Sequence, residues 1–212
     1  MNLEDITKLS HYQTFDFLGG PQKDSNSGKK YELSRLDLMD LKGKDVLDVG
    51  CNAGYFLFRL FPKEPAFMLG IDAGQKFITV ANQINDGFFK TDKAIFICDD
   101  FFTYEFPILF DLIFCFSTFH YFGDKQALFF DMAYKLSKPS ATLLLEVEEY
   151  PLNDFPQVDR SIRPADKKSY PYPNMQQILK WAEGKWILNE KYQSVTQGGS
   201  LYDRFFYRFT KA

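Results

Sequence analysis

The chain has 212 residues, enough for one domain with a substantial buried core. Its hydrophobic fraction of 45% and charged fraction of 25% are ordinary for a globular protein, and a net charge of −3 gives no general attraction for a polyanion. No apolar stretch approaches membrane length, and the first residues are polar and acidic, unlike a signal peptide. Three separated cysteines without metal-ligand spacing predict reduced thiols, no metal site and a cytoplasmic location.

Residues 1–43 are predicted to form an N-terminal helical segment that acts as a lid over the site. Within it, residues 2–10 have the spacing of a short amphipathic helix, and residues 15–30 are rich in glycine and polar residues and predict a loop. Helical spacing of leucines returns over residues 31–41. The polar side chains expected to fold over the site from this segment are Tyr12, Lys29, Tyr31 and Arg35.

The most informative stretch is residues 46–54, which reads Val-Leu-Asp-Val-Gly-Cys-Asn-Ala-Gly. It predicts a short apolar strand that carries Asp48 near its end and runs into a turn of small residues. The next apolar run closes on a second carboxylate, Asp72. Two parallel strands, a glycine turn and an acid at the end of the second strand predict a nucleoside site at the switch point of a doubly wound sheet.

The residues of the turn decide which nucleoside fits. A dinucleotide site needs Gly-x-Gly-x-x-Gly, which Gly50, Asn52 and Tyr55 do not provide. Asp48 would also face the phosphates as a like charge. No Gly-Lys-Ser/Thr ending is present for a nucleotide-hydrolase loop. An adenosine that carries a cationic group instead of phosphates suits an acid here, and S-adenosylmethionine is such a ligand.

At these residues the chain resembles a class I S-adenosylmethionine-dependent methyltransferase, with a match over about residues 44–147. In that family the turn usually reads acid-x-Gly-x-Gly-x-Gly, which corresponds here to Asp48, Gly50, Asn52 and Gly54. The middle glycine is replaced by asparagine, which tolerates left-handed backbone angles better than most residues.

The resemblance implies an α/β fold with a doubly wound, mostly parallel seven-stranded sheet, an antiparallel last strand and helices on both faces. We expect a single methyltransferase domain over residues 1–212, with a cofactor-binding core at 44–147. Residues 148–173 contain five prolines and predict an irregular substrate-side insertion. Residues 174–212 are expected to form a closing helix and an antiparallel strand pair.

Apolar runs along the core and the tail predict the remaining strands at 94–98, 110–116, 141–147, 186–195 and 201–210. The helices between them are predicted at 75–89, 124–137 and 174–183. A shorter helix after the glycine turn must end near Phe61, because Pro62 disfavours helical geometry at the residue before it.

The resemblance also implies which residues hold the cofactor. Asp72 is expected at the ribose, one acid of Asp99 and Asp100 at the adenine amino group, with Asp100 favoured, and Phe101 beside the adenine plane. The loop that begins at Ser117 is expected over the sulfonium. The full cofactor-binding set is Arg35, Asp48, Gly50, Asn52, Gly54, Tyr55, Phe56, Asp72, Ala73, Asp99, Asp100, Phe101, Cys115, Phe116 and Ser117.

Methyl transfer from a sulfonium is an in-line displacement that needs a positioned nucleophile and, where a proton must leave, a base. The predicted catalytic residues are His120, Tyr121, Glu146 and Tyr31. A structural alternative accompanies some of these assignments. His120 lies in an aromatic run, where a packed ring is favoured over a catalytic role. Glu146 is equally a capping or salt-bridge residue, and Arg35 is equally a helix-surface residue.

The acidic net charge and the short, proline-containing cover predict a small-molecule methyl acceptor, with S-adenosylhomocysteine as the other product. They argue against a nucleic-acid or membrane partner. We expect the chain to act as a monomer or homodimer. An RNA or other nucleic-acid methyltransferase is the alternative, favoured by a basic group at Lys23, Lys29, Lys30, Arg160, Arg163, Lys167 and Lys168. A third possibility is a non-methylating protein that binds S-adenosylmethionine or breaks it at another bond.

Overall fold

The computed structural model describes residues 13, 15–18, 26–149, 172–195 and 203–212. Several predicted features lie outside these residues. They are the helix predicted at 2–10, Tyr12, most of the predicted insertion (150–171), the glycine-containing connection 196–202, and the basic residues Lys23, Arg160, Arg163, Lys167 and Lys168.

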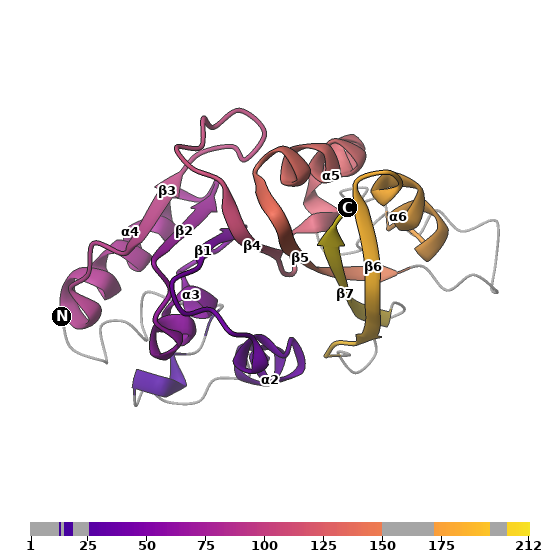
Figure 1. Ribbon diagram of the computed structural model, residues 1–212. Coiled ribbons are helices and arrows are strands. Elements are labelled where there is room, and N and C mark those ends of the chain that lie inside the picture. The colour runs from indigo at the N-terminus through magenta and orange to yellow at the C-terminus, as the bar shows by residue number, and fades with distance from the viewer. Residues whose placement is uncertain (1–12, 14, 19–25, 150–171, 196–202) are drawn as a thin grey trace.

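The described residues form a seven-stranded sheet with the strand order β3-β2-β1-β4-β5-β7-β6 (Figure 1). Its strands are β1 (Asp45–Val49), β2 (Phe67–Asp72), β3 (Ala94–Cys98), β4 (Phe110–Cys115), β5 (Ser137–Glu149), β6 (Trp186–Gln193) and β7 (Asp203–Lys211). β1 to β5 pair in parallel, and β7 runs antiparallel to both β5 and β6. The predicted fold class is confirmed.

Helical segments precede β1 and connect the strands. They are η1 (Asp16–Leu18), α2 (Ser27–Leu33), η2 (Leu36–Leu38), α3 (Tyr55–Leu60), η3 (Phe61–Lys63), α4 (Gln75–Ile84), the π-helical turn η4 (Asn85–Phe89), η5 (Phe119–Lys125), α5 (Gln126–Lys135) and α6 (Met175–Ala182). None of these helices is long and apolar enough to cross a lipid bilayer.

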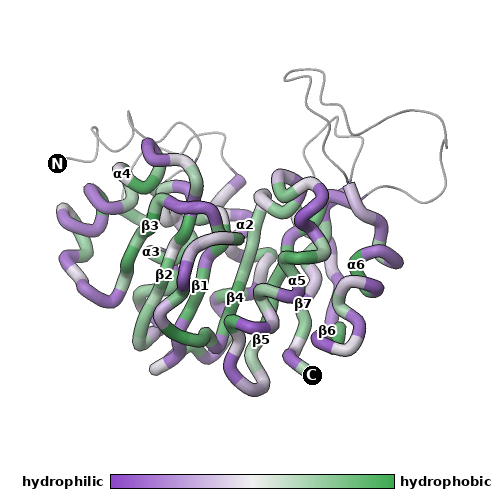
Figure 2. The backbone as a smooth tube through the Cα atoms, turned by 90° about the horizontal axis from the view of Figure 1, so that it is seen from above, coloured by the Kyte–Doolittle hydropathy of each residue, from purple (hydrophilic) through white to green (hydrophobic). Residues whose placement is uncertain are grey.

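Each face of the sheet has its own core, because successive residues of a strand point to opposite sides. Val46 of β1 packs with residues of α2, α3 and α4, whereas Leu47 and Val49 pack with α5 and α6. In Figure 1, α2 and α3 lie below the sheet and α5 lies above it. Figure 2 shows hydrophobic central strands between helices that carry hydrophilic residues.

The helical spacing over residues 31–41 produces two short helices instead of one. α2 begins at Ser27, inside the segment predicted as a loop, and ends at Leu33, because Arg35 has a left-handed backbone (φ 59°). Ser34 stabilises this break. Its hydroxyl donates to the Tyr31 carbonyl oxygen (2.6 Å) and accepts from the Leu36 N–H (3.3 Å).

β5 is longer than the predicted strand at 141–147. It begins at Ser137, because α5 already ends at Lys135, and it continues to Glu149. The antiparallel partner β7 accounts for the extension, since its pairing with β5 runs on to Glu148 and Glu149. α6 starts as the sequence predicts, because Asn174 and Gln177 form a capping box at its first turn.

Candidate active site

The turn between β1 and α3 requires residues that accept left-handed backbone angles. Gly50 and Gly54 have φ values of 79° and 82°, and Asn52 has a φ of 51°. A Cβ atom at Gly50 would lie 2.1 Å from Thr118 Oγ1, and one at Gly54 would lie 2.6 Å from the Phe96 ring. Asparagine replaces the middle glycine without loss of the turn, as the sequence analysis expected, and its Oδ1 accepts the Ala53 N–H (2.8 Å).

Asp72 ends β2 beside this turn and holds it in place. Its Oδ2 accepts the Asn52 N–H (2.9 Å) and its Oδ1 accepts the Gly74 N–H (2.8 Å) at the start of α4. A carboxylate oxygen can accept more than one hydrogen bond. Asp72 therefore stabilises both loops and keeps acceptor capacity toward the cavity that it lines.

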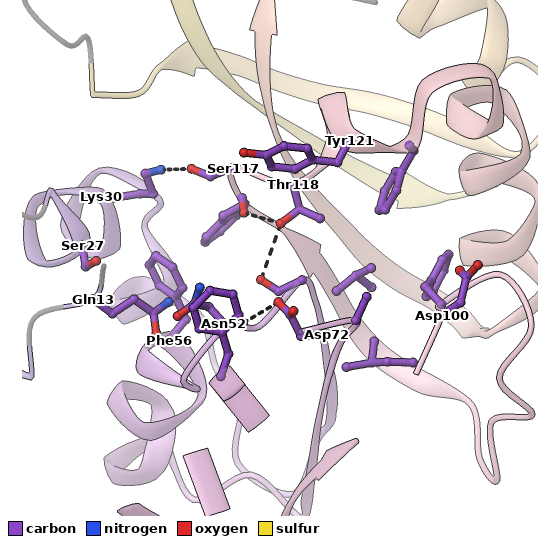
Figure 3. Close-up of a pocket in the computed structure, with 18 of the residues that line it drawn as sticks. Gln13, Ser27, Lys30, Asn52, Phe56, Asp72, Asp100, Ser117, Thr118 and Tyr121 are labelled. Atoms are coloured by element: carbon purple, nitrogen blue, oxygen red, sulfur yellow. Dashed lines mark hydrogen bonds between the residues drawn. The ribbon is translucent and has the colours of Figure 1, made fainter. Parts of the chain in front are cut away.

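A cavity of about 1160 Å³ opens at the carboxyl ends of β1, β2, β3 and β4. Figure 3 shows Asp100 on one side of it, Lys30 and Ser117 on the opposite side, and Asn52 and Asp72 between them. The residues predicted for the site that line this cavity are Gly50, Asn52, Phe56, Asp72, Ala73, Asp99, Asp100, Phe101, Phe116, Ser117 and Tyr121.

The side of the cavity that contains Asp100 combines acids with aromatic rings. Asp100 Oδ1 accepts the Phe102 N–H (2.9 Å), and its Oδ2 lies 3.4 Å from Lys125 Nζ. Asp99 turns back to accept the Asp100 N–H (2.7 Å). Phe101 is buried against Phe102, their ring centroids 5.3 Å apart, and both line the cavity. A flat, apolar ring with polar edges fits such surroundings.

The opposite side is built around Ser117 and the buried Glu146. Lys30 donates to Ser117 Oγ and to Glu146 Oε2 (2.8 Å), so α2 is tied to the ends of β4 and β5. Ser117 donates to Glu146 Oε2 through both its backbone N–H (2.9 Å) and its hydroxyl (3.0 Å). Arg204 of β7 donates to Ser117 Oγ (3.0 Å) and is paired with Glu148. We call Lys30, Ser117, Glu146, Glu148 and Arg204 the Ser117 cluster.

Glu146 is an ionised acceptor in this cluster. Its residue is 3% exposed, and burial alone would raise its pKa. The cations of Lys30 and Arg204, with hydrogen bonds from Lys30 and from Ser194 Oγ (2.5 Å), outweigh burial, so the pKa of Glu146 lies below its usual value. A carboxylate with a lowered pKa is a poor proton acceptor at neutral pH.

Asp48 is buried and does not line the cavity. It is 1% exposed, and its Oδ2 has no hydrogen-bond partner among the described residues. Burial raises the pKa of Asp48 well above its ordinary value, and the neighbouring Asp72 carboxylate raises it further. Burial also raises the pKa of the Cys51 and Cys115 thiols. Burial and the Asp72 carboxylate thus disfavour the negative charge that the sequence predicts for Asp48.

Several other residues predicted for the site lie apart from the cavity lining. Tyr31 is buried and donates to the Arg59 carbonyl oxygen (3.4 Å), and Arg35 pairs with Glu190 at the surface (2.8 Å). His120 is buried with its ring centroid 6.0 Å from that of Tyr172. The remaining residues of the predicted set outside the lining are Asp48, Gly54, Tyr55, Cys115 and Glu146. Their predicted roles stay predictions.

Several polar residues that line the cavity were not predicted for the site from the sequence, among them Gln13, Lys30 and Arg204. Gln13 Oε1 accepts the Ala53 N–H (3.1 Å) and the Tyr55 N–H (3.3 Å), which brings the N-terminal segment onto the glycine turn. Lys30 was noted only as part of a basic patch, and Arg204 was not noted at all. A cation within the aromatic run of β7 was the one available signal for Arg204.

No group of three or more His, Cys, Asp or Glu side chains within the described ranges could hold a metal ion.

The family comparison agrees with the motif. A family model described as a methyltransferase domain matches residues 40–191. This match covers more than half of the chain and confirms the resemblance drawn from the glycine turn and the strand-end acids.

Solved structures share the fold. The N-methyltransferase NodS from Bradyrhizobium japonicum WM9, in complex with S-adenosyl-l-homocysteine, superposes with a TM-score of 0.70 at 17% identity, over 99% of this chain and 97% of that one. Magnesium protoporphyrin IX methyltransferase from Synechocystis PCC 6803, with bound S-adenosylhomocysteine, gives 0.65 at 14% identity, over 93% of both chains. At these identities the likeness concerns the fold alone.

Curated relatives point to a different acceptor from the predicted one. A "tRNA U34 carboxymethyltransferase" of Helicobacter pylori (strain Shi470) is 29% identical over 179 residues, which are 80% of this chain and 66% of that protein. A protein of the same name from Desulfotalea psychrophila is 50% identical over 46 residues, which are 22% of this chain. Another from Campylobacter lari is 26% identical over 115 residues, which are 54% of this chain. These two matches span 14% and 39% of the relatives' own lengths, less than two thirds in both cases.

The prediction of a small-molecule acceptor without a nucleic-acid partner is therefore wrong, and the relatives favour the nucleic-acid alternative. The error came from the net charge of the whole chain. That value does not describe the distribution of charge in the cavity, whose lining includes the cations Lys30, Lys76, Lys125 and Arg204 as well as the acids Asp72, Asp99 and Asp100.

Proposed function

The chain belongs to the methyltransferase-domain family, and we propose that this S-adenosylmethionine-dependent methyltransferase alkylates a nucleoside of tRNA. The donor follows from the family and from the glycine turn with its strand-end acid. The acceptor is supported by relatives named as tRNA U34 carboxymethyltransferases, one of them aligned over 80% of this chain. A tRNA acceptor also supports the predicted cytoplasmic location.

We propose that the cofactor lies across the cavity from Asp100 to Ser117. Asp72 would accept hydrogen bonds from the ribose hydroxyls, and the acids and rings at Asp99–Phe102 would surround the adenine. Gly50 supports this fit, because a side chain at that position would meet Thr118 and narrow the cavity. When bound, S-adenosylmethionine supplies an electrophilic methyl group on its sulfonium.

The residues of the chain contribute position and electrostatics to the transfer. Ser117 would lie next to the reacting carbon, and Lys30, Glu146 and Arg204 fix its hydroxyl from three directions. Glu146 is held as an anion and acts as a positioning residue in this proposal. The nucleophilic atom of the nucleoside takes the alkyl group as the carbon–sulfur bond breaks, and any proton that it carries leaves to solvent.

The relatives' name also gives a second candidate, in which a carboxymethyl group is transferred. Lys30 and Arg204 line the cavity at the Ser117 end, where the alkyl group of the donor would lie. Lys30 uses two of its three N–H groups on Ser117 and Glu146. The third N–H and the remaining donors of Arg204 suit a donor with a carboxylate on the transferred carbon.

The proposal is tested by nucleoside analysis of tRNA from cells that produce the chain and from cells that produce Asp72→Ala. We expect a modified nucleoside only with the unsubstituted chain, and its mass distinguishes methyl from carboxymethyl. The variant should bind S-adenosylhomocysteine more weakly by roughly 1–3 kcal/mol. Asp86→Ala, at an exposed position of η4, is the matched control and should behave like the unsubstituted chain. Identical tRNA nucleosides with and without the chain would contradict the proposal.

A further inference from the structure

Tyr121 is a large aromatic residue that remains exposed at the wall of the cavity. It is 55% exposed, although its neighbours in the same aromatic run, Phe119 and His120, are buried. Its ring lines the cavity, and Figure 3 shows it above Thr118, on the same side as Ser117. Filling of the core accounts for the neighbouring rings, but it does not account for Tyr121.

Contacts with Thr118 and His120 fix the position of Tyr121. Its backbone N–H donates to the Thr118 carbonyl oxygen (2.8 Å), and its ring centroid lies 4.1 Å from that of His120. Thr118 is held in turn, because its hydroxyl donates to the Phe116 carbonyl oxygen (3.1 Å) and lies within 3.5 Å of the Gly50 carbonyl oxygen. The ring is therefore placed relative to the glycine turn and to Ser117, the two sides of the proposed donor site.

Cations accompany this ring along the cavity. Lys76 and Lys125 both line it. Lys125 Nζ lies 3.4 Å from Asp100 Oδ2 in an exposed pair, which contributes little to stability, and 4.8 Å from the Phe102 ring centroid. An exposed aromatic ring and cations that line the same cavity are features of a single-stranded nucleic-acid site, in which bases stack on aromatic rings and cations contact the backbone.

Resting on the proposed function, we propose that Tyr121 is the stacking surface for the acceptor nucleobase. Enzymes that modify a base take it out of its stack and hold it against aromatic or apolar side chains. Here the base would lie on the Tyr121 ring, close to Ser117, and face the alkyl group of the donor. The interaction requires the ring and does not require the phenol hydroxyl.

The test compares Tyr121→Phe, Tyr121→Ala and the control Ile187→Ala, which removes a 57% exposed side chain from β6, away from the cavity. The substrate is an unmodified tRNA anticodon stem-loop, and the readouts are kcat/KM and the Kd for S-adenosylhomocysteine. We expect Tyr121→Ala to lower kcat/KM by roughly 5- to 150-fold, the loss of one base stack. Tyr121→Phe and Ile187→Ala should stay within about twofold of the unsubstituted chain, and the Kd should not change in any variant.

Three results would overturn the proposal. An unchanged kcat/KM in Tyr121→Ala would mean that no base stacks there. An equal loss in Tyr121→Phe would assign the effect to the hydroxyl. A weaker Kd for S-adenosylhomocysteine in Tyr121→Ala would place the cofactor on the ring instead. Failure of the proposed function is distinguishable, because the unsubstituted chain would then leave the stem-loop unmodified while still binding S-adenosylhomocysteine.

Discussion

Asp48 is a buried carboxyl residue of β1, and the cavity lies next to the turn that follows this strand. The sequence places an acid at the first strand end and suggests that it attracts a cation. In the fold, its carboxyl is buried beside Asp72 and has a raised pKa. A cation bound in the cavity would favour the ionised form, so ligand binding and proton release are expected to be linked at this residue.

The stability of the protein should therefore fall with pH on account of Asp48. In the unfolded chain an aspartate loses its proton above about pH 4, whereas in the folded chain Asp48 keeps it up to its raised pKa. Unfolding then releases a proton between these two pKa values, so stability falls as pH rises through this window. Asp48→Asn should have a higher Tm than the unsubstituted chain at pH 8, and the difference should vanish near pH 4. Equal Tm values at pH 8 would contradict a raised pKa of the buried Asp48.

Substitution of Gly50 tests whether the turn between β1 and α3 requires a residue without a side chain. Gly50→Ala would combine a left-handed φ with contact against Thr118, whereas Gly43→Ala has a similar φ of 69° and nothing within 4 Å. Gly43→Ala should cost about 1–2 kcal/mol of stability. Gly50→Ala should cost more and also weaken S-adenosylhomocysteine binding, measured by calorimetry. Equal stability losses in the two variants, with binding retained, would show that the turn tolerates a side chain.

At the scale of elements, the sequence predicts local structure better than it predicts contacts between residues that are far apart in the chain. The strand–turn–helix unit around Gly50 and the acid at Asp72 could be read from neighbouring residues, because backbone angles and strand ends are local properties. Lys30 and Glu146 are 116 residues apart, and Arg204 and Ser117 are 87 apart. Such pairs depend on the order of β4, β5 and β7 in the sheet, which composition and spacing alone do not determine.

The buried ion pair between Lys30 of α2 and Glu146 of β5 should be costly to break. Removal of one partner leaves a buried charge, so Lys30→Met and Glu146→Gln should each destabilise the protein by roughly 3–5 kcal/mol. The double variant should cost clearly less than the sum of the two. Lys42→Met, from the exposed pair with Glu64, should cost at most about 1 kcal/mol. Urea unfolding measures all four, and additive losses at Lys30 and Glu146 would contradict a direct pair.

Glu146 also predicts sensitivity to acid. Its folded pKa is lowered, so its contribution to stability is present above its unfolded pKa, about 4.3, and is lost as pH falls through the lowered folded value. The unsubstituted chain should therefore lose stability below pH ~4 more steeply than Glu146→Gln does. Parallel curves of stability against pH would indicate that the carboxylate is not favoured by its neighbours.

For the whole molecule, the net charge of the chain does not indicate the charges that line the cavity. The chain is acidic overall, yet Lys76 and Lys125 line the same cavity as Tyr121. RNA affinity should fall as salt concentration rises, because each phosphate contact releases a counterion. The variant with both Lys76→Gln and Lys125→Gln should bind the stem-loop more weakly at low salt and depend less on salt. An affinity independent of salt in the unsubstituted chain would contradict an RNA acceptor.

The central claim is that one cavity brings an adenosyl sulfonium donor to a tRNA nucleoside. The most direct measurement is the intact mass of an anticodon stem-loop after incubation with the purified chain and S-adenosylmethionine. One stem-loop carries uridine at the wobble position and a matched one carries cytidine. The account predicts addition of one methyl group to the uridine stem-loop and formation of S-adenosylhomocysteine in equal amount. Both stem-loops unchanged, with S-adenosylhomocysteine formed only when a small-molecule acceptor is supplied, would contradict it.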